Sequence, residues 1–161
     1  MITVSNTSPI TNLAALGQLN LLQQLYNTII ILQAVYDEMA GLSYFVPGGI
    51  EVQTLPWIQT QQVTNRSLVR ELQTEIDAGE SEAIALAIVI KAERLILDDY
   101  KDRIVASRLG LKFTGVLGIL LVAKQRGLIS AVTPVIDDLI AEAGFRVSAQ
   151  LYAKILQSAR E

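Results

Sequence analysis

Carboxylate side chains gather around one apolar segment in the middle of the chain. Glu80 and Glu82 open an apolar helical pattern, and a strand expected at Leu95–Leu97 runs directly into Asp98 and Asp99. Consecutive Leu, Ile and Leu are typical of a parallel sheet covered on both faces, and ligands of such sheets collect beyond the carboxyl ends of the strands. The chain contains no His and no Cys. The sequence therefore predicts hard divalent cations bound by oxygen, in preference to zinc or thiol chemistry.

Strand and helix patterns alternate along most of the chain. We expect strands at Ile2–Ser5, Ile29–Leu32, Trp57–Val63 (at an edge), Leu95–Leu97 and Lys112–Thr114. The first helix is predicted to have Ser8 as its N-cap and Pro9 at its first position, and a break near Gly17 divides it in two. Further helices are expected at Gln33–Ala40, Ser67–Gln73, from Glu80 to a reversal at Ala92–Arg94, after Arg103 as far as Gly110, and at Gly115–Arg126, Thr133–Ala143 and Ser148–Ala159.

Two breaks in the helical patterns are also predicted. Pro47 and two adjacent glycines make Gly41–Gly49 a loop, and Asp77-Ala78-Gly79 separates two helices. The alternation as a whole predicts a single domain, residues 1–161. Its fold class is α/β, with three α/β/α layers, a central, mostly parallel sheet and a helical C-terminal part.

The carboxyl ends of parallel strands share one edge of the sheet, and this places several polar side chains on one rim. Asn6 follows the first strand, Glu38 follows the second, and the aspartate pair follows the fourth. Glu82 lies at the start of its helix and is expected to reach the same crevice. Glu80 is roughly 200° away from Glu82 around that helix, so both cannot face one site. We therefore interpret Glu80 as complementing the helix dipole.

The composition of the chain limits the classes of protein to which it can belong. The chain has 161 residues, of which 51% are apolar, and this suits one domain with a substantial core. Its longest apolar runs are far shorter than the roughly 20 residues that span a bilayer. The first residues also lack a basic leader followed by an apolar run, so we expect a cytoplasmic protein that does not associate with membranes.

The charge is distributed unevenly along the chain. All 13 Lys and Arg residues follow residue 65, whereas only Asp37, Glu38 and Glu51 of the 16 acidic residues precede it. No basic stripe of the kind that marks a nucleic-acid footprint is present in the sequence. If nucleic acid binds, a local patch or a metal ion must hold it.

Five motifs, taken in order, resemble the PIN-domain family of nucleases, and more narrowly an uncharacterised prokaryotic branch related to VapC-type toxins. They are VSNTSPI (4–10), AVYDEM (34–39), AGESEAIALA (78–87), LILDDYKDRIVA (95–106) and FTGVLGILLVAKQRGLI (113–129). The resemblance implies a PIN-like fold. It also implies a metal-dependent ribonuclease that hydrolyses RNA through an acidic cluster.

Carried over position by position, the resemblance implies a site for Mg²⁺ or Mn²⁺. The metal ligands would be Asn6, Glu38, Glu82 and Asp99, with Asp98 as an adjacent candidate, and the catalytic residues would be Glu38, Glu82 and Asp99. An aspartate is expected at the first position. Asn6 offers a neutral carbonyl oxygen there, so the site loses one negative charge.

Basic residues and partners follow from the same resemblance. Lys101, Arg103 and Arg108, just after the fourth strand, are candidates for phosphate contacts. The expected partners are RNA, a small antitoxin-like protein and a second copy of the chain in a homodimer.

Other interpretations of these residues stay open. Asn6 also suits a turn before Pro9, and an aspartate after the fourth strand also suits a helix cap. Asn6 favours a catalytically weak or inactive PIN-like domain that binds RNA or an antitoxin-like protein. The aspartate pair also suggests a phosphoacceptor switch, although that class carries its acidic pair after the first strand.

Overall fold

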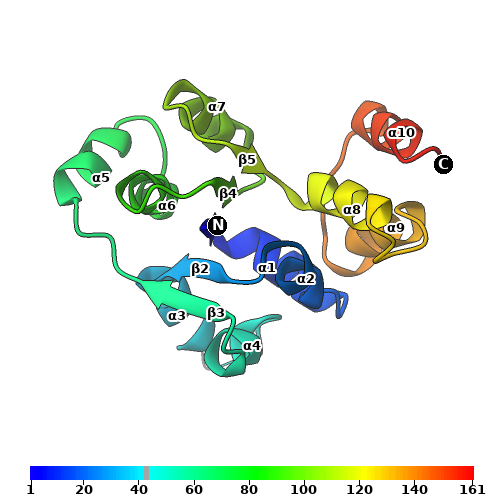
Figure 1. Cartoon of the computed structure of the whole chain (residues 1–161), viewed down its shortest axis with the longest axis horizontal. Helices are drawn as coiled ribbons and strands as arrows, with labels where there is room; N and C mark the ends of the chain where they lie inside the picture. Colours follow the sequence, from blue (N-terminus) through cyan, green and yellow to red (C-terminus); the bar gives the residue numbers. More distant parts are fainter. Residues whose placement is uncertain (42–43) are drawn as a thin grey trace.

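Five short strands form one parallel sheet in the order β3-β2-β1-β4-β5 in the computed structural model, which describes residues 1–41 and 44–161 (Figure 1). The strands are β1 (Thr3–Ser5), β2 (Ile29–Leu32), β3 (Ile58–Gln61), β4 (Arg94–Ile96) and β5 (Phe113–Thr114). Every pairing is parallel. The chain moves outward from β1 to β3 and then returns to β4 on the other side. The order of the strands therefore reverses between β1 and β4, where ligands of such sheets bind.

Helices cover both faces of this sheet. They are α1 (Thr7–Ala15), α2 (Asn20–Tyr26), α3 (Gln33–Ala40), α4 (Gly49–Thr54), α5 (Arg66–Leu72), α6 (Ala78–Val89), α7 (Tyr100–Arg108), α8 (Val116–Gln125), α9 (Thr133–Glu142) and α10 (Ala149–Ser158). Helices α1, α2, α8 and α9 pack together on one side, and α5 and α6 lie on the other (Figure 1). The predicted three-layer α/β/α fold is confirmed.

The central strands and α6 form the most apolar part of the core. All residues of β1 and β2 are buried, as a strand covered on both faces requires. Helix α6 contacts β1, β2 and β4, and its buried residues include Ala83, Ala85 and Ala87. These small side chains allow the helix to lie close to the sheet, so the segment that opens with Glu80 is held firmly at the centre of the molecule.

Three predicted boundaries were wrong. Helix α1 begins at Thr7 with Asn6 as its N-cap, so neither Ser8 nor Pro9 takes the predicted capping position. Helix α6 begins at Ala78 with Asp77 as its N-cap, because an exposed first turn tolerates the glycine that was expected to break it.

The third correction concerns the predicted loop Gly41–Gly49. Gly49 already belongs to α4, a short helix that the adjacent glycines concealed. Gly48 precedes it with φ of 89°, a conformation that favours glycine. Leu42 and Ser43, also in the predicted loop, lie outside the described residues.

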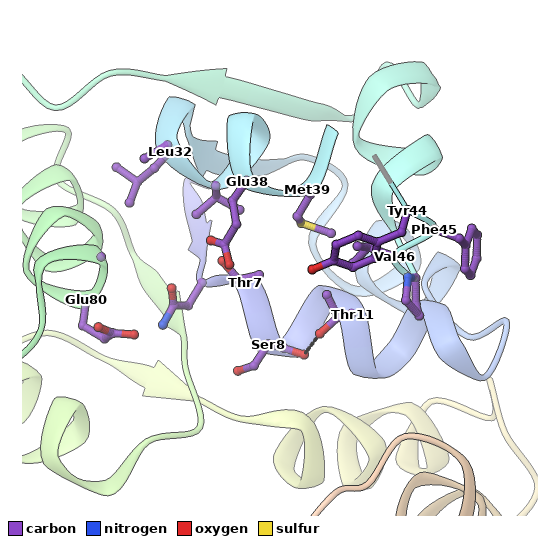
Figure 2. A pocket seen from close by; sticks show the side chains of 15 residues that line it. Thr7, Ser8, Thr11, Leu32, Glu38, Met39, Tyr44, Phe45, Val46 and Glu80 are labelled. Atoms are coloured by element: carbon purple, nitrogen blue, oxygen red, sulfur yellow. Dashed lines mark hydrogen bonds between the residues drawn. The ribbon is translucent and has the colours of Figure 1, made fainter. Parts of the chain in front are cut away.

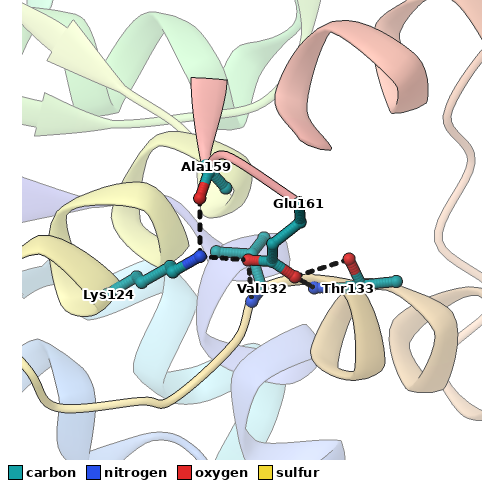
Figure 3. Close-up of polar contacts among 5 residues, drawn as sticks. All are labelled: Lys124, Val132, Thr133, Ala159 and Glu161. Carbon is teal, nitrogen blue, oxygen red and sulfur yellow. Dashed lines mark hydrogen bonds and ion pairs between the residues drawn. The ribbon is translucent and has the colours of Figure 1, made fainter. Parts of the chain in front are cut away.

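A carboxylate ties the last helix to the rest of the molecule (Figure 3). Glu161 accepts hydrogen bonds from the backbone N–H groups of Val132 (2.8 Å) and Thr133 (3.0 Å) at the start of α9. It also accepts from the Thr133 hydroxyl (2.6 Å) and from Lys124 Nζ (2.9 Å) on α8. These bonds, led by that of the Thr133 hydroxyl, lower the pKa of Glu161 to about 2.

No helix in the described part of the chain combines the length and the apolar character needed to cross a bilayer.

We predict that Glu161→Gln lowers the melting temperature by a few degrees at pH 7, because the neutral amide loses the ion pair and one acceptor. The folded-state pKa of Glu161 lies below its ordinary value of 4.5, so its contribution to stability is present above pH 4.5 and is lost as the pH falls toward about 2. The variant should therefore lack this part of the acid-induced loss in a thermal melt series. Glu142→Gln, at an exposed position of α9, is the matched control. Identical melting of the two variants at pH 7 would contradict the prediction.

Candidate functional site

A pocket of about 660 Å³ opens at the carboxyl ends of β1 and β2. The start of α1, one face of α3, residues 44–47 and the first turn of α6 line it (Figure 2). Asn6, Thr7 and Ser8 contribute amide and hydroxyl groups. The pocket therefore lies at the predicted edge of the sheet, beside the point where the strand order reverses.

Two carboxylates face this pocket. Figure 2 shows Glu38 and Glu80 projecting toward it from α3 and α6. Asn6 is the N-cap of α1, yet its side chain accepts no capping hydrogen bond from the described residues. Its amide is therefore available to the pocket. Of the predicted metal ligands, the structure brings together Asn6 and Glu38, with Glu80 as a third member.

Glu82 does not line this pocket. Its Oε1 is 3.2 Å from Nη1 of Arg66, and the two side chains line a separate hollow of about 180 Å³. Because α6 begins at Ala78, Glu80 occupies its third position and Glu82 its second turn. The helical period already predicted that the two glutamates point in opposite directions. Which of them faces the pocket depends on how the helix is oriented in the fold.

Asp98 holds the start of α8. Its Oδ1 accepts a hydrogen bond of 3.0 Å from the backbone N–H of Val116 and lies 3.7 Å from Nη2 of Arg103. Burial raises the pKa of Asp98, while the Val116 N–H and Arg103 act in the opposite direction. Asp98 lines a second pocket of about 360 Å³ and does not line the one that contains Glu38 and Glu80.

Arg103 completes this contact from α7. It donates two hydrogen bonds to the carbonyl oxygen of Leu97 (3.1 and 3.0 Å) and lies over the Phe113 ring, 5.3 Å from its centroid. Gly115 passes so close that an added Cβ would lie 2.0 Å from Nη2 of Arg103 and 2.3 Å from Oδ1 of Asp98. The backbone at this position must therefore be glycine for the ion pair to form as it does.

Asp99 is the N-cap of α7. Its Oδ1 accepts hydrogen bonds from the backbone N–H groups of Lys101 (2.8 Å) and Asp102 (3.3 Å). Asp98 accepts the first N–H of α8, whose N-cap is Gly115, so each member of the aspartate pair holds the start of a different helix. Both aspartates, which the family resemblance placed in a metal site, therefore have a structural role in which one carboxylate oxygen binds backbone N–H groups.

The three predicted phosphate contacts are not equivalent. Arg108 pairs with Glu75, its Nη1 lying 2.8 Å from Oε1, and Arg103 is occupied as described above. Arg103 and Arg108 line a shallow hollow of about 580 Å³ that also contains Tyr100. Lys101 is exposed and does not line this hollow.

Asp102, which was not among the predicted site residues, is 3% exposed. Burial raises the pKa of this carboxyl to about 7, and the nearby Asp99, Glu80 and Asp77 act in the same direction. A signal was present in the sequence. Asp77 and Glu80 at the start of α6, like Asp99 and Asp102 at the start of α7, are a cap residue followed three positions later by an acid.

The donor atoms of the Glu38–Glu80 pocket are chemically suited to Mg²⁺ or Mn²⁺. Two carboxylates, an amide carbonyl and hydroxyls are hard oxygen donors, and Mg²⁺ is commonly held by one or two carboxylates with water and phosphate oxygens. Among residues 1–41 and 44–161, no three acidic side chains form a group that could hold a metal ion. An ion in this pocket would therefore keep several positions for water or substrate.

A family model described as a PIN domain matches residues 2–161. The match confirms the resemblance to the PIN-domain family that the sequence motifs predicted. A comparison with curated proteins finds no match.

We predict that Asp102→Asn stabilises the protein above pH 7. The folded-state pKa of Asp102, about 7, lies above its ordinary value of 3.8. The stability of the folded state that depends on a protonated Asp102 is thus present in full below pH 3.8 and is lost as the pH rises through about 7. The variant should gain on the wild type between these values and keep an advantage of about 1–3 kcal/mol at pH 8 after solvent screening.

Urea unfolding from pH 4 to pH 8 measures this difference. Asp138→Asn, at an exposed position of α9, controls for the loss of one charge. If the free energy of unfolding varies with pH in the same way for the wild type and Asp102→Asn, the charged form of Asp102 is not destabilised by its surroundings.

Proposed function

Since the chain belongs to the PIN-domain family, we propose that it is a ribonuclease dependent on Mg²⁺ or Mn²⁺ that hydrolyses RNA phosphodiester bonds in the Glu38–Glu80 pocket. The observation that carries the proposal is the convergence of these two carboxylates on one pocket, at the carboxyl edge of a nuclease-type fold.

Electrostatics gives this pair a reason to bind a cation. Carboxylates that face one space repel, and a cation that binds between them removes this repulsion. Glu38 and Glu80 would hold the ion, with the Asn6 carbonyl oxygen as a neutral third ligand. When bound, the cation would lower the pKa of a water molecule and neutralise charge at the phosphoryl oxygens.

The start of α1 suits the phosphate group of the substrate. Thr7 and Ser8 provide hydroxyl groups in the pocket and open a helix whose N-terminus carries a partial positive charge. None of the described lining residues is Lys or Arg. Phosphate binding in the pocket would therefore rely on the cation, the hydroxyls and the helix. Lys101 remains our candidate for a contact with a more distant phosphate, and Arg103 and Arg108 would need to exchange their present partners.

Two aromatic side chains at the pocket favour a single-stranded substrate. Tyr44 is 68% exposed and Phe45 is 77% exposed. Unpaired bases stack on exposed aromatic rings with little dependence on sequence, whereas paired bases do not present their faces.

We predict that Glu38→Gln and Glu80→Gln each weaken Mn²⁺ binding at least about tenfold in calorimetric titration. Each should also lower Mn²⁺-dependent cleavage of single-stranded RNA about a hundredfold, because both substitutions remove a charged ligand and keep the side-chain size. Glu82→Gln is the matched control, since its carboxylate pairs with Arg66 outside the pocket. If Glu82→Gln loses binding while Glu80→Gln retains it, the site assignment predicted from the sequence is the correct one.

We also predict that Asn6→Asp strengthens Mn²⁺ binding about tenfold and raises the rate of RNA cleavage, because it restores a negative charge beside Glu38 and Glu80. Asn20→Asp, at an exposed position of α2, controls for the added charge. Equal affinities in the wild type and Asn6→Asp would argue against Asn6 as a ligand.

A second candidate function is a catalytically weak or inactive domain that binds RNA or a small antitoxin-like protein. The neutral Asn6 and the use of both Asp98 and Asp99 to hold helix starts favour it. Absence of Mn²⁺ binding and of RNA cleavage in both the wild type and Asn6→Asp would favour this alternative over the ribonuclease. A toxin role and a homodimer remain proposals that rest on the family resemblance, and a cytoplasmic location remains a proposal that rests on the sequence.

A further inference from the structure

Two hollows adjoin along β5, the edge strand of the sheet that follows β4 in the strand order. One, of about 360 Å³, lies between β5, α8 and α10, and the other, of about 580 Å³, lies between β5 and α7. Arg103 and Phe113 line both hollows, so the two meet at these side chains. Helices α7 and α10 lie on different sides of β5 (Figure 1). We refer to the two hollows together as the β5 groove.

Aromatic side chains are spaced along the β5 groove. Tyr100 lines the hollow beside α7, Phe145 lines the hollow beside α10, and Phe113 is shared by both. The Tyr100 side chain is 77% exposed, and Ile104, one turn further along α7, is 50% exposed. Large apolar side chains that are grouped in a hollow and left in water mark a contact site. Unpaired nucleic-acid bases stack on such rings.

Arginines lie between these aromatic rings. Arg103, Arg108 and Arg146 line the groove, and Asp98 is the one acid among its described lining residues. Arg103 pairs with Asp98, and Arg108 pairs with Glu75. Arg146 is exposed and forms no ion pair with a described residue. The groove therefore has an excess of positive charge and one cation that is ready to meet a phosphate.

The β5 groove and the Glu38–Glu80 pocket have opposite charge. The pocket holds two carboxylates and no described Lys or Arg, whereas arginine is the predominant charged residue of the groove. The two sites are also neighbours, because Glu80 lies near Asp102 in the first turn of α7 and Tyr100 opens that turn. A strand that leaves the pocket past Glu80 would thus meet Tyr100 at the start of the groove.

We propose that the β5 groove binds single-stranded RNA outside the site of cleavage, with unpaired bases stacked on Tyr100 and Phe145 and a phosphate held by Arg146. Arg103 keeps its contacts with Leu97 and Asp98 and separates the two hollows. The interleaving of aromatic rings with arginines favours a nucleic-acid strand over a protein segment. The inference deepens the proposed function and rests on it for the choice of RNA as the strand.

Fluorescence anisotropy with a labelled 2′-O-methyl RNA strand of about 12 nucleotides, in EDTA, measures binding without metal and without cleavage. We expect the wild type to bind this strand at least tenfold more tightly than a duplex of the same length, whose paired bases do not present their faces. Tyr100→Ala should weaken binding of the single strand about tenfold. Tyr100→Phe keeps the ring and should bind as the wild type does. The exposed position of Tyr100 should leave the melting temperature of both variants unchanged.

Arg146→Gln is the second variant and tests the phosphate contact. It should weaken binding severalfold and lower the slope of log affinity against log salt by about 0.7, the value for one phosphate of a single strand. Arg70→Gln, at an exposed position of α5 that does not line the groove, is the matched control and should bind as the wild type does.

The inference is overturned if Tyr100→Ala and Arg146→Gln keep the affinity of the wild type, or if Tyr100→Phe binds as weakly as Tyr100→Ala. It is also overturned if the wild type binds no nucleic acid, a result that would point to a protein segment as the occupant of the groove. A failure of the proposed function gives a different result. In that case Glu38→Gln and Glu80→Gln bind Mn²⁺ as the wild type does and RNA is not cleaved, yet binding in EDTA still depends on Tyr100.

Discussion

The parallel direction of all five strands is the constraint on which the rest of this structure depends. A strand followed by a helix that runs back across the sheet places the N-terminus of that helix beyond the carboxyl end of the strand. Helices α1, α3, α7 and α8 begin in this way directly after β1, β2, β4 and β5, and α6 begins at the same edge because it runs back toward the start of β4. Several partial positive charges therefore meet along one edge, and acidic side chains are favoured there.

The acidic residues at these helix N-termini have two different roles. Asp98 and Asp99 accept backbone N–H groups and fix where α8 and α7 begin. Glu38 and Glu80 accept no hydrogen bond from the described backbone in this way and face the pocket instead. Asp102 combines burial with an oxygen that has no hydrogen-bond partner among the described residues, so its charged form is costly. The caps position the helices, and the helices position the carboxylates that remain available for a ligand.

The uneven distribution of basic residues has a structural consequence. The chain before residue 66 contains no Lys or Arg, and it supplies most of the pocket wall. Several basic side chains of the later part are engaged within the protein, including Arg66, Arg103 and Lys124. No Lys or Arg among the described lining residues therefore balances the negative charge of Glu38 and Glu80 in the pocket.

Residue patterns alone determined the order of strands and helices and the parallel sheet, and they placed Asn6 and Glu38 at one edge of it. They could do so because buried apolar runs and helical periods are local properties, and because parallel strands share one carboxyl edge. The concealed helix α4 was missed, since adjacent glycines usually mark a loop. Only the tertiary structure decided that Glu80 faces the pocket while Glu82 pairs with Arg66, and that Asp102 is buried among other acids. The helical period specifies the angle between two side chains, but what each side chain faces depends on how the helix packs against its neighbours.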